Sequence, residues 1–270
     1  MPPRRSVTSS SPESTAVKEV PFIGGNMNDA TRVGDTVRRR AGPWTPAVHA
    51  LLRFLENAGF EAPRPRGMDE RGREILEYVD GDAHTGWPDP APDWVRDDDH
   101  LAAGARLLRR YHDLVERFEP PAEARWRLVA PTAHDIICHN DWAPWNAIFR
   151  ERRLAVMLDW DMAGPGTRMW DIANSAYSWI PLFSESRVVA IEEQARRLRL
   201  FCDAYRLSDR ASLLDVLNER TLFVGEFVAE QARLGDKGAI KLADWGVPER
   251  MRRNAAYQNE HRAVLERALA

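Results

Sequence analysis

The sequence predicts an α+β fold in which a small sheet-rich lobe precedes a larger, mainly helical lobe, and three observations predict it. Between residues 20 and 79, short apolar runs alternate with turn residues, which is typical of antiparallel strands, and one helical pattern interrupts them. Residues 81 to 96 are rich in Pro, Gly, Asp and Trp, which indicates a linker or a long loop. Beyond that segment, most apolar residues recur at helical spacing.

These patterns divide the chain into three parts. We expect a flexible tail over residues 1–19, a first lobe over residues 20–80 and a helical lobe over residues 81–270. The tail carries Arg, Ser and Pro but lacks the apolar segment of a secretory signal. We find no internal repeat and no heptad pattern.

The helix of the first lobe has distinct start and stop signals. Thr45 is a suitable N-cap, and Pro46 occupies the first helical position. Gly59 is typical of a helix end. The apolar residues between these signals form one stripe: Val48, Leu51, Leu52 and Leu55.

The second lobe should be built mainly from long helices. The first spans about residues 98–118, and Asp97, Asp98 and Asp99 suit the positive end of its dipole. Further helices are predicted over these ranges: 169–182, 187–206, 209–234 and 247–268. The exception is 136–158, where short apolar runs separated by turn-like charges indicate strands.

Composition argues against several classes of partner. The formal net charge is -3 and the pI about 6.2, so the chain lacks the basic field typical of nucleic-acid binding. No apolar run reaches the roughly 18 residues that span a bilayer, so no membrane association is expected. The two cysteines, Cys138 and Cys202, are too few for a disulfide framework. We therefore expect a reducing, cytoplasmic compartment, and the oligomeric state stays open.

Polar residues interrupt the apolar segment ICHNDWAPWNAIF at residues 137–149. The runs AIF and LAVML on either side of the RERR turn are typical of two antiparallel strands. Because such a hairpin places the start of its first strand beside the end of its second, Asn146 and Asp159 should be neighbours. Amide and carboxylate oxygens are ligands that Mg²⁺ prefers. Asp141, one short loop away, would then face a substrate held at that metal.

These groups match the needs of phosphoryl transfer, in which a protein positions the nucleophile and holds metal with an Asp and an Asn. Protein kinases use His-Arg-Asp, a following Asn, and then Asp-Phe-Gly. The same spacing occurs here in four residues: His139, Asp141, Asn146 and Asp159. The letters differ at intervening positions, since Asn140 replaces the Arg, and Trp160 and Asp161 replace the Phe and Gly.

The segments HNDWAPWN and LDWDMAGPGTRMWDIA resemble the aminoglycoside phosphotransferase and choline kinase family, small-molecule kinases with a protein-kinase-like fold. The resemblance implies transfer of the ATP γ-phosphate to a hydroxyl of a small molecule, with Mg²⁺ as cofactor. It implies that Asp141 is the catalytic base, that Asn146 and Asp159 hold the metal, and that His139 braces the catalytic loop. Asp171 resembles the structural aspartate that binds backbone N–H groups of that loop, and it also suits a helix N-cap.

By the same resemblance, the first lobe should hold the nucleotide. No lysine lies between Lys18 and Lys237, so the usual strand-borne lysine must be replaced, and Arg38 in TVRRRAG is our candidate. His49 occupies the place expected for the acidic partner of that cation. Two other segments are candidates for nucleotide contacts, a phosphate turn and an adenine hinge: Gly24, Gly25 and Asn26, then Glu77, Tyr78 and Val79. The choice between ATP and GTP stays open.

The acceptor is not fixed by the sequence. In the resembled family it lies against the C-terminal helices, where acidic side chains hold polyamines. A wall of carboxylates would favour a cationic aminoglycoside, and an aromatic box would favour a quaternary amine such as choline. Four acidic residues are available in these helices: Asp203, Glu226, Glu230 and Glu260.

Three other interpretations remain open. The polar trio could be a buried network without chemistry. A metallohydrolase could use the segment HDIICHND, with His134, Asp135, His139 and Asp141 as ligands. Finally, the missing lysine would suit a catalytically silent nucleotide-binding or interaction protein of the same fold. The tryptophans around the motif are read as core packing, with a cation cage as the alternative.

Overall fold

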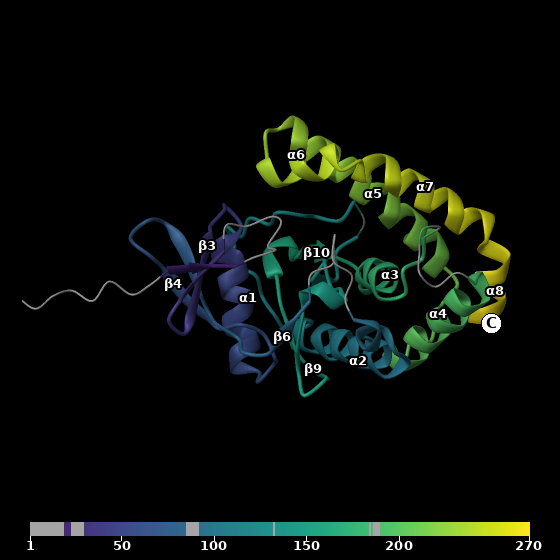
Figure 1. The fold of residues 1–270 in the computed structure, drawn as a ribbon, viewed down its shortest axis with the longest axis horizontal. Coiled ribbons are helices and arrows are strands. Elements are labelled where there is room, and N and C mark those ends of the chain that lie inside the picture. The colour runs from purple at the N-terminus through teal and green to yellow at the C-terminus, as the bar shows by residue number, and fades with distance from the viewer. Residues whose placement is uncertain (1–18, 23–29, 85–91, 132, 184, 186–189) are drawn as a thin grey trace, which may run out of the picture.

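The computed structural model describes residues 19–22, 30–84, 92–131, 133–183, 185 and 190–270. An antiparallel sheet with one helix forms one end of the molecule, and most helices gather at the other end (Figure 1). The predicted α+β architecture is confirmed. Of the predicted tail, all but Glu19 lies outside the described residues.

Five strands form the sheet of the first lobe. In chain order they are β1 (Glu19–Pro21), β2 (Thr31–Val33), β3 (Thr36–Arg40), β4 (Pro65–Met68) and β5 (Arg73–Glu77). Their spatial order is β1-β2-β3-β5-β4, and all neighbours are antiparallel. Arg39 lies opposite Glu74 in the β3–β5 register, and Arg38 lies opposite Ile75. Because side chains alternate along a strand, Arg38 and Arg39 project to opposite faces of the sheet.

The single helix of this lobe is α1 (Thr45–Asn57). Its buried stripe contains the predicted apolar residues, and Gly59 adopts a left-handed φ of 69° just beyond its end. The N-cap position belongs to Trp44 and not to Thr45, so the predicted cap is wrong by one residue. The Thr45 hydroxyl instead accepts a hydrogen bond of 2.9 Å from the Gly42 N–H, which closes the turn before the helix.

Short strands connect the two lobes and carry the catalytic segment. β6 (Asp82–Ala83) pairs with β8 (Ala147–Arg150), and β8 pairs with β9 (Arg153–Met157). The predicted hairpin is thus confirmed. A second pair joins β7 (Ile136–Cys138) to β10 (Gly164–Gly166), which places the segments before and after the hairpin side by side.

The second lobe is built from seven helices among the residues described. They are α2 (Asp98–Val115), α3 (Arg168–Trp179), α4 (Ile191–Tyr205), α5 (Leu213–Arg233), α6 (Lys237–Asp244), α7 (Val247–Glu260) and α8 (Arg262–Leu269). The sequence did not predict α6, and the single helix predicted over 247–268 is two helices. His261, with φ of -100° and ψ of 9°, lies between them and leaves helical geometry.

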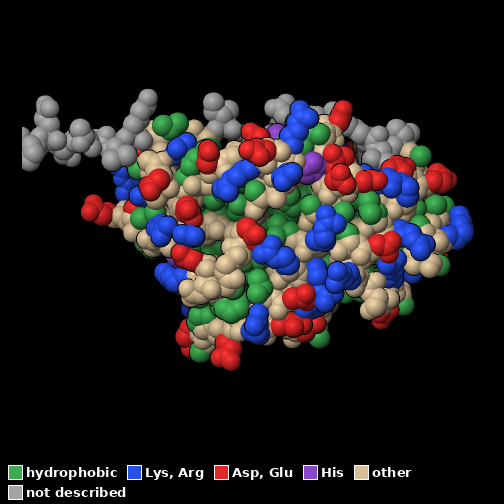
Figure 2. All heavy atoms as spheres, turned by 90° about the horizontal axis from the view of Figure 1, so that it is seen from below, with side chains coloured by type: hydrophobic (Ala, Val, Ile, Leu, Met, Phe, Trp, Pro, Cys, Tyr) green, Lys and Arg blue, Asp and Glu red, His purple; other side chains and the backbone are tan. Residues whose placement is uncertain are grey.

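One continuous apolar core runs through both lobes, from the buried face of α1 to the helices of the second lobe. Four tryptophans of the motif region are fully buried in it: Trp142, Trp160, Trp170 and Trp179. The core-packing interpretation is therefore confirmed for these four, while Trp145 is exposed. Within the described part of the chain, no helix has the length and apolar character needed to cross a membrane. Figure 2 shows acidic and basic side chains interspersed over one face of the molecule.

Candidate active site

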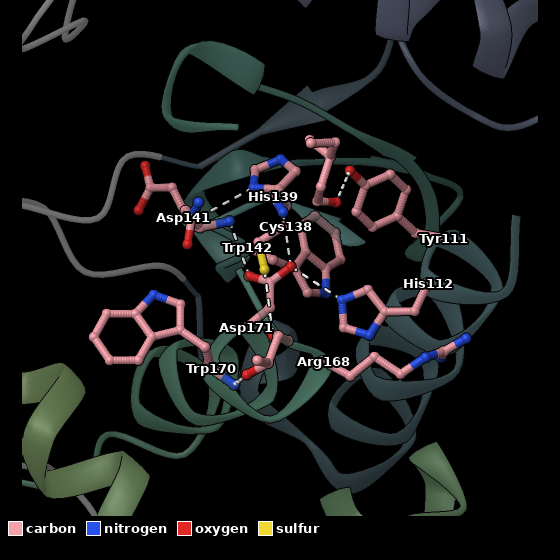
Figure 3. A network of polar contacts seen from close by, with 12 residues as sticks. Tyr111, His112, Cys138, His139, Asp141, Trp142, Arg168, Trp170 and Asp171 are labelled. Atoms are coloured by element: carbon pink, nitrogen blue, oxygen red, sulfur yellow. Dashed lines mark hydrogen bonds and ion pairs between the residues drawn. The ribbon is translucent and has the colours of Figure 1, made fainter. Parts of the chain in front are cut away.

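The loop after β7 is shaped by one buried carboxylate (Figure 3). Asp171, in the first turn of α3, accepts hydrogen bonds from the backbone N–H groups of His139 at 2.7 Å and Asn140 at 2.8 Å. Asn140 has a left-handed φ of 65°, so these bonds hold a conformation that a non-glycine residue seldom adopts. The N-cap of α3 is Thr167, whose hydroxyl accepts from Trp170 N–H, so the N-cap interpretation of Asp171 is wrong.

His139 is fully buried and both of its ring nitrogens are engaged within the loop. Its Nε2 lies 2.9 Å from the Leu158 carbonyl oxygen, and its Nδ1 lies 3.2 Å from the Asp141 backbone nitrogen. The Nε2–H therefore donates and Nδ1 accepts, which is the neutral ring. Burial lowers the pKa of His139, in keeping with that assignment. His139 thus ties the catalytic loop to the end of the β8–β9 hairpin.

Asp141 and Asn146 are joined directly. The Asn146 amide nitrogen donates to the Asp141 backbone oxygen and to its carboxylate Oδ2, both at 2.8 Å. This arrangement leaves the Asn146 Oδ1 available as an oxygen ligand. Burial and the nearby charge of Asp159 raise the pKa of Asp141 to about 7.

Asp159 lies just after β9, the second strand of the hairpin, and Asn146 lies just before β8, its first strand. The Leu158 N–H donates to the Asn146 carbonyl oxygen at 2.8 Å, and Ala147 pairs with Met157. Asp159 has a left-handed φ of 57°, and its side chain keeps 37% of its surface exposed. The structure therefore brings Asp141, Asn146 and Asp159 together at one edge of the hairpin.

These groups suit Mg²⁺ better than a metallohydrolase centre. Mg²⁺ is usually held by one or two protein oxygens together with substrate phosphates, which an amide oxygen and a carboxylate can provide. The part of the chain that the structure describes contains no group of three or more His, Cys, Asp or Glu suited to a metal ion. His134 instead contacts the Ala130 carbonyl oxygen at 3.0 Å, and the nitrogens of His139 are both used.

A buried arginine from the first lobe meets this site. The Arg39 guanidinium contacts Asp159 at 3.0 Å and Asp161 at 2.7 Å, and its Nε donates to Glu74 of β5. Burial disfavours the charge of Arg39, but Asp161, Glu74 and Asp159 outweigh that effect and raise its pKa above the ordinary value. Burial also raises the pKa of Asp161, to about 6. We call Arg39, Glu74, Asp159 and Asp161 the Arg39 cluster.

The structure brings Arg39, and not the predicted Arg38, to the site. Arg38 lies on the opposite face of β3, where its Nη1 donates to the Thr36 hydroxyl at 2.6 Å. The acidic partner of Arg39 comes from strand β5 and not from the helix. His49 of α1, which sequence reasoning assigned to the partner's place, contacts Glu74 at 3.0 Å and so reaches Arg39 only indirectly.

The other nucleotide candidates are placed only in part. Gly24, Gly25 and Asn26 lie outside the described residues. Glu77 ends β5, and Tyr78 and Val79 follow in the connection to β6. Tyr78 donates its backbone N–H to Asp35 at 2.8 Å, and the Arg32 guanidinium stacks 3.6 Å from its ring centroid. The role of Glu77, Tyr78 and Val79 as an adenine hinge stays a prediction.

The acidic candidates for acceptor binding are all exposed: Asp203, Glu226, Glu230 and Glu260. Two of them already face arginines, because Glu230 pairs with Arg233 at 2.6 Å and Asp203 pairs with Arg210 at 2.5 Å. The structure does not single out any of the four.

Sequence reasoning missed a second buried arginine near the loop. Arg220 of α5 is 3% exposed and donates to the Asn140 carbonyl oxygen at 2.9 Å, with its guanidinium 5.1 Å from the Trp170 ring centroid. Burial lowers its pKa to about 10. In a helical pattern, a charged residue such as Arg220 is normally assigned to the solvent-exposed face of the helix. No local signal in the sequence therefore indicated that it is buried.

Comparison with known proteins identifies the family of this chain. A model of the phosphotransferase enzyme family matches residues 92–213. The trifolitoxin immunity protein of Rhizobium leguminosarum bv. trifolii is 31% identical over 268 residues, which cover 93% of this chain and 99% of that protein.

Solved structures of small-molecule kinases share the fold. An amicoumacin kinase in complex with AMP-PNP, Ca²⁺ and Ami is 12% identical, with a TM-score of 0.63, over 93% of this chain and 89% of that one. A choline kinase from Streptococcus pneumoniae is 14% identical, with a TM-score of 0.57, over 88% and 93% of the two chains. A choline/ethanolamine kinase family protein from Mesorhizobium loti is 14% identical, with a TM-score of 0.51, over 96% and 92%. The chain therefore belongs to the phosphotransferase enzyme family and has its protein-kinase-like fold.

Proposed function

We propose that this protein is an ATP- and Mg²⁺-dependent phosphotransferase that moves the γ-phosphate to a hydroxyl of a small molecule. The observation that carries the proposal is the Asp141 carboxylate bonded to Asn146 beside Asp159. Membership of the family supports the reaction class. The nucleotide complexes of proteins with the same fold, one with AMP-PNP and one with ADP, support ATP as the donor.

Asp141 is the proposed catalytic base. Its Oδ2 is fixed by the Asn146 amide at 2.8 Å, which leaves Oδ1 to accept the proton of the acceptor hydroxyl. A pKa near 7 keeps enough proton affinity for that step at neutral pH, where a base works best. His139 positions the loop and does not react.

Asn146 and Asp159 are the proposed metal ligands. The Asn146 Oδ1 and the Asp159 carboxylate would hold Mg²⁺, which would supply positive charge opposite the phosphates of the nucleotide. The partly exposed Asp159 side chain leaves room for such a ligand. The hydrogen bonds of Asn146 to Asp141 fix its Oδ1 in a single direction.

Arg39 is the proposed replacement for the phosphate-binding lysine. Its guanidinium has a fork geometry that fits two phosphate oxygens. Glu74 and His49 fix it from the sheet and from α1, whereas Asp159 contacts it from the other lobe. The Arg39 guanidinium would bind phosphate oxygens in place of the Asp159 carboxylate, while Glu74 and Asp161 keep it in position. The hinge Glu77 to Val79 and the turn Gly24 to Asn26 remain proposed nucleotide contacts.

The acceptor class is proposed from relatives. Proteins of this fold include kinases for aminoglycosides and amino alcohols, so an acceptor of either kind is the first candidate. The name of the Rhizobium relative adds a second, because that protein is an immunity protein against a toxin. A toxin bearing a hydroxyl would be phosphorylated here. A different function, toxin binding without turnover, corresponds to the catalytically silent alternative.

The test compares wild type with Asp141→Asn, which keeps the shape of the side chain but removes the base. Turnover of ATP is measured with Mg²⁺ against aminoglycosides, amino alcohols and hydroxyl-bearing toxins. We expect turnover to fall roughly 100- to 10,000-fold, the usual contribution of a catalytic base, with ATP affinity retained. Asp215→Asn is the matched control, because that carboxylate is 68% exposed and pairs only with Arg262 on the surface.

Unchanged turnover in Asp141→Asn would remove Asp141 as the base. Binding of ATP or of a toxin by calorimetry without turnover on any acceptor would favour the silent binding protein. Asp159→Ala tests the metal role separately from the base, because this variant should lose Mg²⁺-dependent nucleotide binding.

A further inference from the structure

A chain of hydrogen bonds runs from the surface of the second lobe to the loop that follows β7, and Figure 3 shows its inner end, where His112 bonds to Asp171. Arg168 Nη1 lies 3.2 Å from the Tyr205 hydroxyl, which lies 2.7 Å from His112 Nδ1. His112 Nε2 lies 3.0 Å from the same Asp171 carboxylate that binds the loop amides. Helices α2, α3 and α4 each contribute to the chain. We call Arg168, Tyr205 and His112 the relay.

The direction of every bond in the relay can be assigned from its groups. Asp171 is ionised, because its oxygens accept from two loop amides and from His112, and these hydrogen bonds hold its pKa below the ordinary value although burial alone would raise it. His112 Nε2 therefore donates to Asp171. Burial raises the pKa of Tyr205 to about 12, so the hydroxyl keeps its proton.

Only one arrangement then gives every hydrogen an acceptor. Arg168 has no acceptor capacity, so its N–H must donate to the Tyr205 oxygen. The Tyr205 O–H donates to His112 Nδ1, which leaves the Nε2–H of a neutral ring for Asp171. Asp171 thus requires the tautomer of His112 with its hydrogen on Nε2, and the Tyr205 hydroxyl satisfies that tautomer by donating to the remaining nitrogen, Nδ1.

Burial makes the inner part of the relay stiff, and surface ion pairs fix its outer end. His112 and Asp171 have no exposed surface, so water does not replace a partner lost there, whereas Tyr205, 2% exposed, borders a surface cavity. Arg168 is held by Asp113 at 2.9 Å and by Glu116 at 2.6 Å, both near the end of α2. Its side chain lines a surface cavity of about 490 Å³ together with Tyr205 and Arg206.

We infer that Tyr205 and His112 are positioning residues of the phosphotransferase, with Arg168 as their outer anchor. They hold Asp171 in the orientation that fixes the amides of His139 and Asn140, and through them the direction of Asp141. This inference rests on the proposed function for its catalytic consequence. Its structural part, control of the loop amides by a distant hydroxyl, is independent of that function.

The test is Tyr205→Phe, which removes one hydroxyl and keeps the ring. The matched control is Tyr177→Phe, because the Tyr177 hydroxyl is also engaged, 2.7 Å from Asn254 Nδ2, but bonds to α7 and not to the loop. Both variants should lose a similar amount of thermal stability. Only Tyr205→Phe should speed hydrogen exchange of the His139 and Asn140 amides, by roughly three- to tenfold for one lost hydrogen bond.

Two further readouts sharpen the comparison. Nitrogen-15 spectra of His112 should show the Nε2–H tautomer in all three proteins, and only Tyr205→Phe should shift the Nδ1 signal, because Nδ1 loses its hydrogen-bond donor there. With a working acceptor, Tyr205→Phe should lower kcat by roughly three- to tenfold with the nucleotide KM unchanged. A purely structural role would lower thermal stability without changing kcat.

Equal amide exchange and equal His112 spectra in the two variants would overturn the inference. Altered exchange and spectra with an unchanged kcat would overturn its catalytic consequence. If wild type turns over no acceptor, the proposed function fails. Hydrogen exchange of the loop amides and the nitrogen-15 spectra of His112 still decide whether the relay controls the loop. His112→Asn is a second variant, expected to loosen the same two amides at least as much.

Discussion

The Arg39 cluster and the Asp171 network lie on either side of the catalytic loop, and they are built differently. Arg39 faces three carboxylates from two lobes, and one of them, Asp159, is 37% exposed. Asp171 is fully buried, and its two oxygens accept from two backbone amides and a histidine. The Arg39 cluster is charged and open to solvent at one edge, whereas the Asp171 network is buried and its donors and acceptors are paired.

This difference indicates which groups can change partners. In the proposed function Arg39 would exchange Asp159 for an anion, because it keeps Glu74 and Asp161 as partners. Asp159 would then take a cation at the edge that is open to solvent. Asp171 cannot change partners without leaving buried donors unpaired, which is costly. The protein thus combines an ionic cluster that is open to solvent with a closed support for the loop that carries Asp141.

The largest expected effect comes from breaking the closed region. Asp171→Ala leaves the amides of His139 and Asn140 and the His112 N–H buried without an acceptor, so the free energy of unfolding should fall by about 3–5 kcal/mol. Urea denaturation measures it. The control is Glu249→Ala, which removes an exposed pair with Arg252 and should change stability by less than about 1 kcal/mol. An equal loss of unfolding free energy in Asp171→Ala and Glu249→Ala would contradict the closed, fully paired character of the Asp171 network.

The open region should respond to ligands instead. At saturating concentrations of about 100 times Kd, ATP with Mg²⁺ should stabilise wild type by about 2.7 kcal/mol, and hence raise Tm by roughly 5–10 °C. Asp159→Asn should lose the Mg²⁺-dependent part of that shift, whereas Asp215→Asn should keep it. Thermal shift with ATP, with and without Mg²⁺, provides the measurement. A full shift in Asp159→Asn would mean that the metal binds elsewhere.

The smallest effect should be a pH dependence of the closed region. The pKa of Asp171 is lower in the folded protein, so the folded state binds its proton less readily than the unfolded chain. Its stabilising contribution is present above the ordinary carboxyl pKa of about 3.9 and is lost as pH falls below that value. The stability gap between wild type and Asp171→Asn should therefore narrow below about pH 4, by on the order of 1 kcal/mol. A gap that widens on acidification would contradict this sign.

Spacing along the chain was enough to predict the core of the site. Asp141, Asn146 and Asp159 lie on one loop and one tight hairpin, where local geometry leaves few arrangements. Asp171 was found through its family resemblance. Arg38 was chosen over Arg39 because adjacent strand residues differ only in the face to which they project. The correct choice depends on the register of β3 with β5 and on which face of the sheet is turned toward the second lobe.

The sequence by itself determined the order of the elements, because turns, alternation and helical periodicity are local properties, and its motifs identified the family. Only the tertiary structure decided which cations meet the motif. Arg39 reaches it across the lobes, Arg220 from α5, and the relay from three helices. These contacts join residues far apart in the chain, and burial, rather than any local pattern, determines which charges must find partners there.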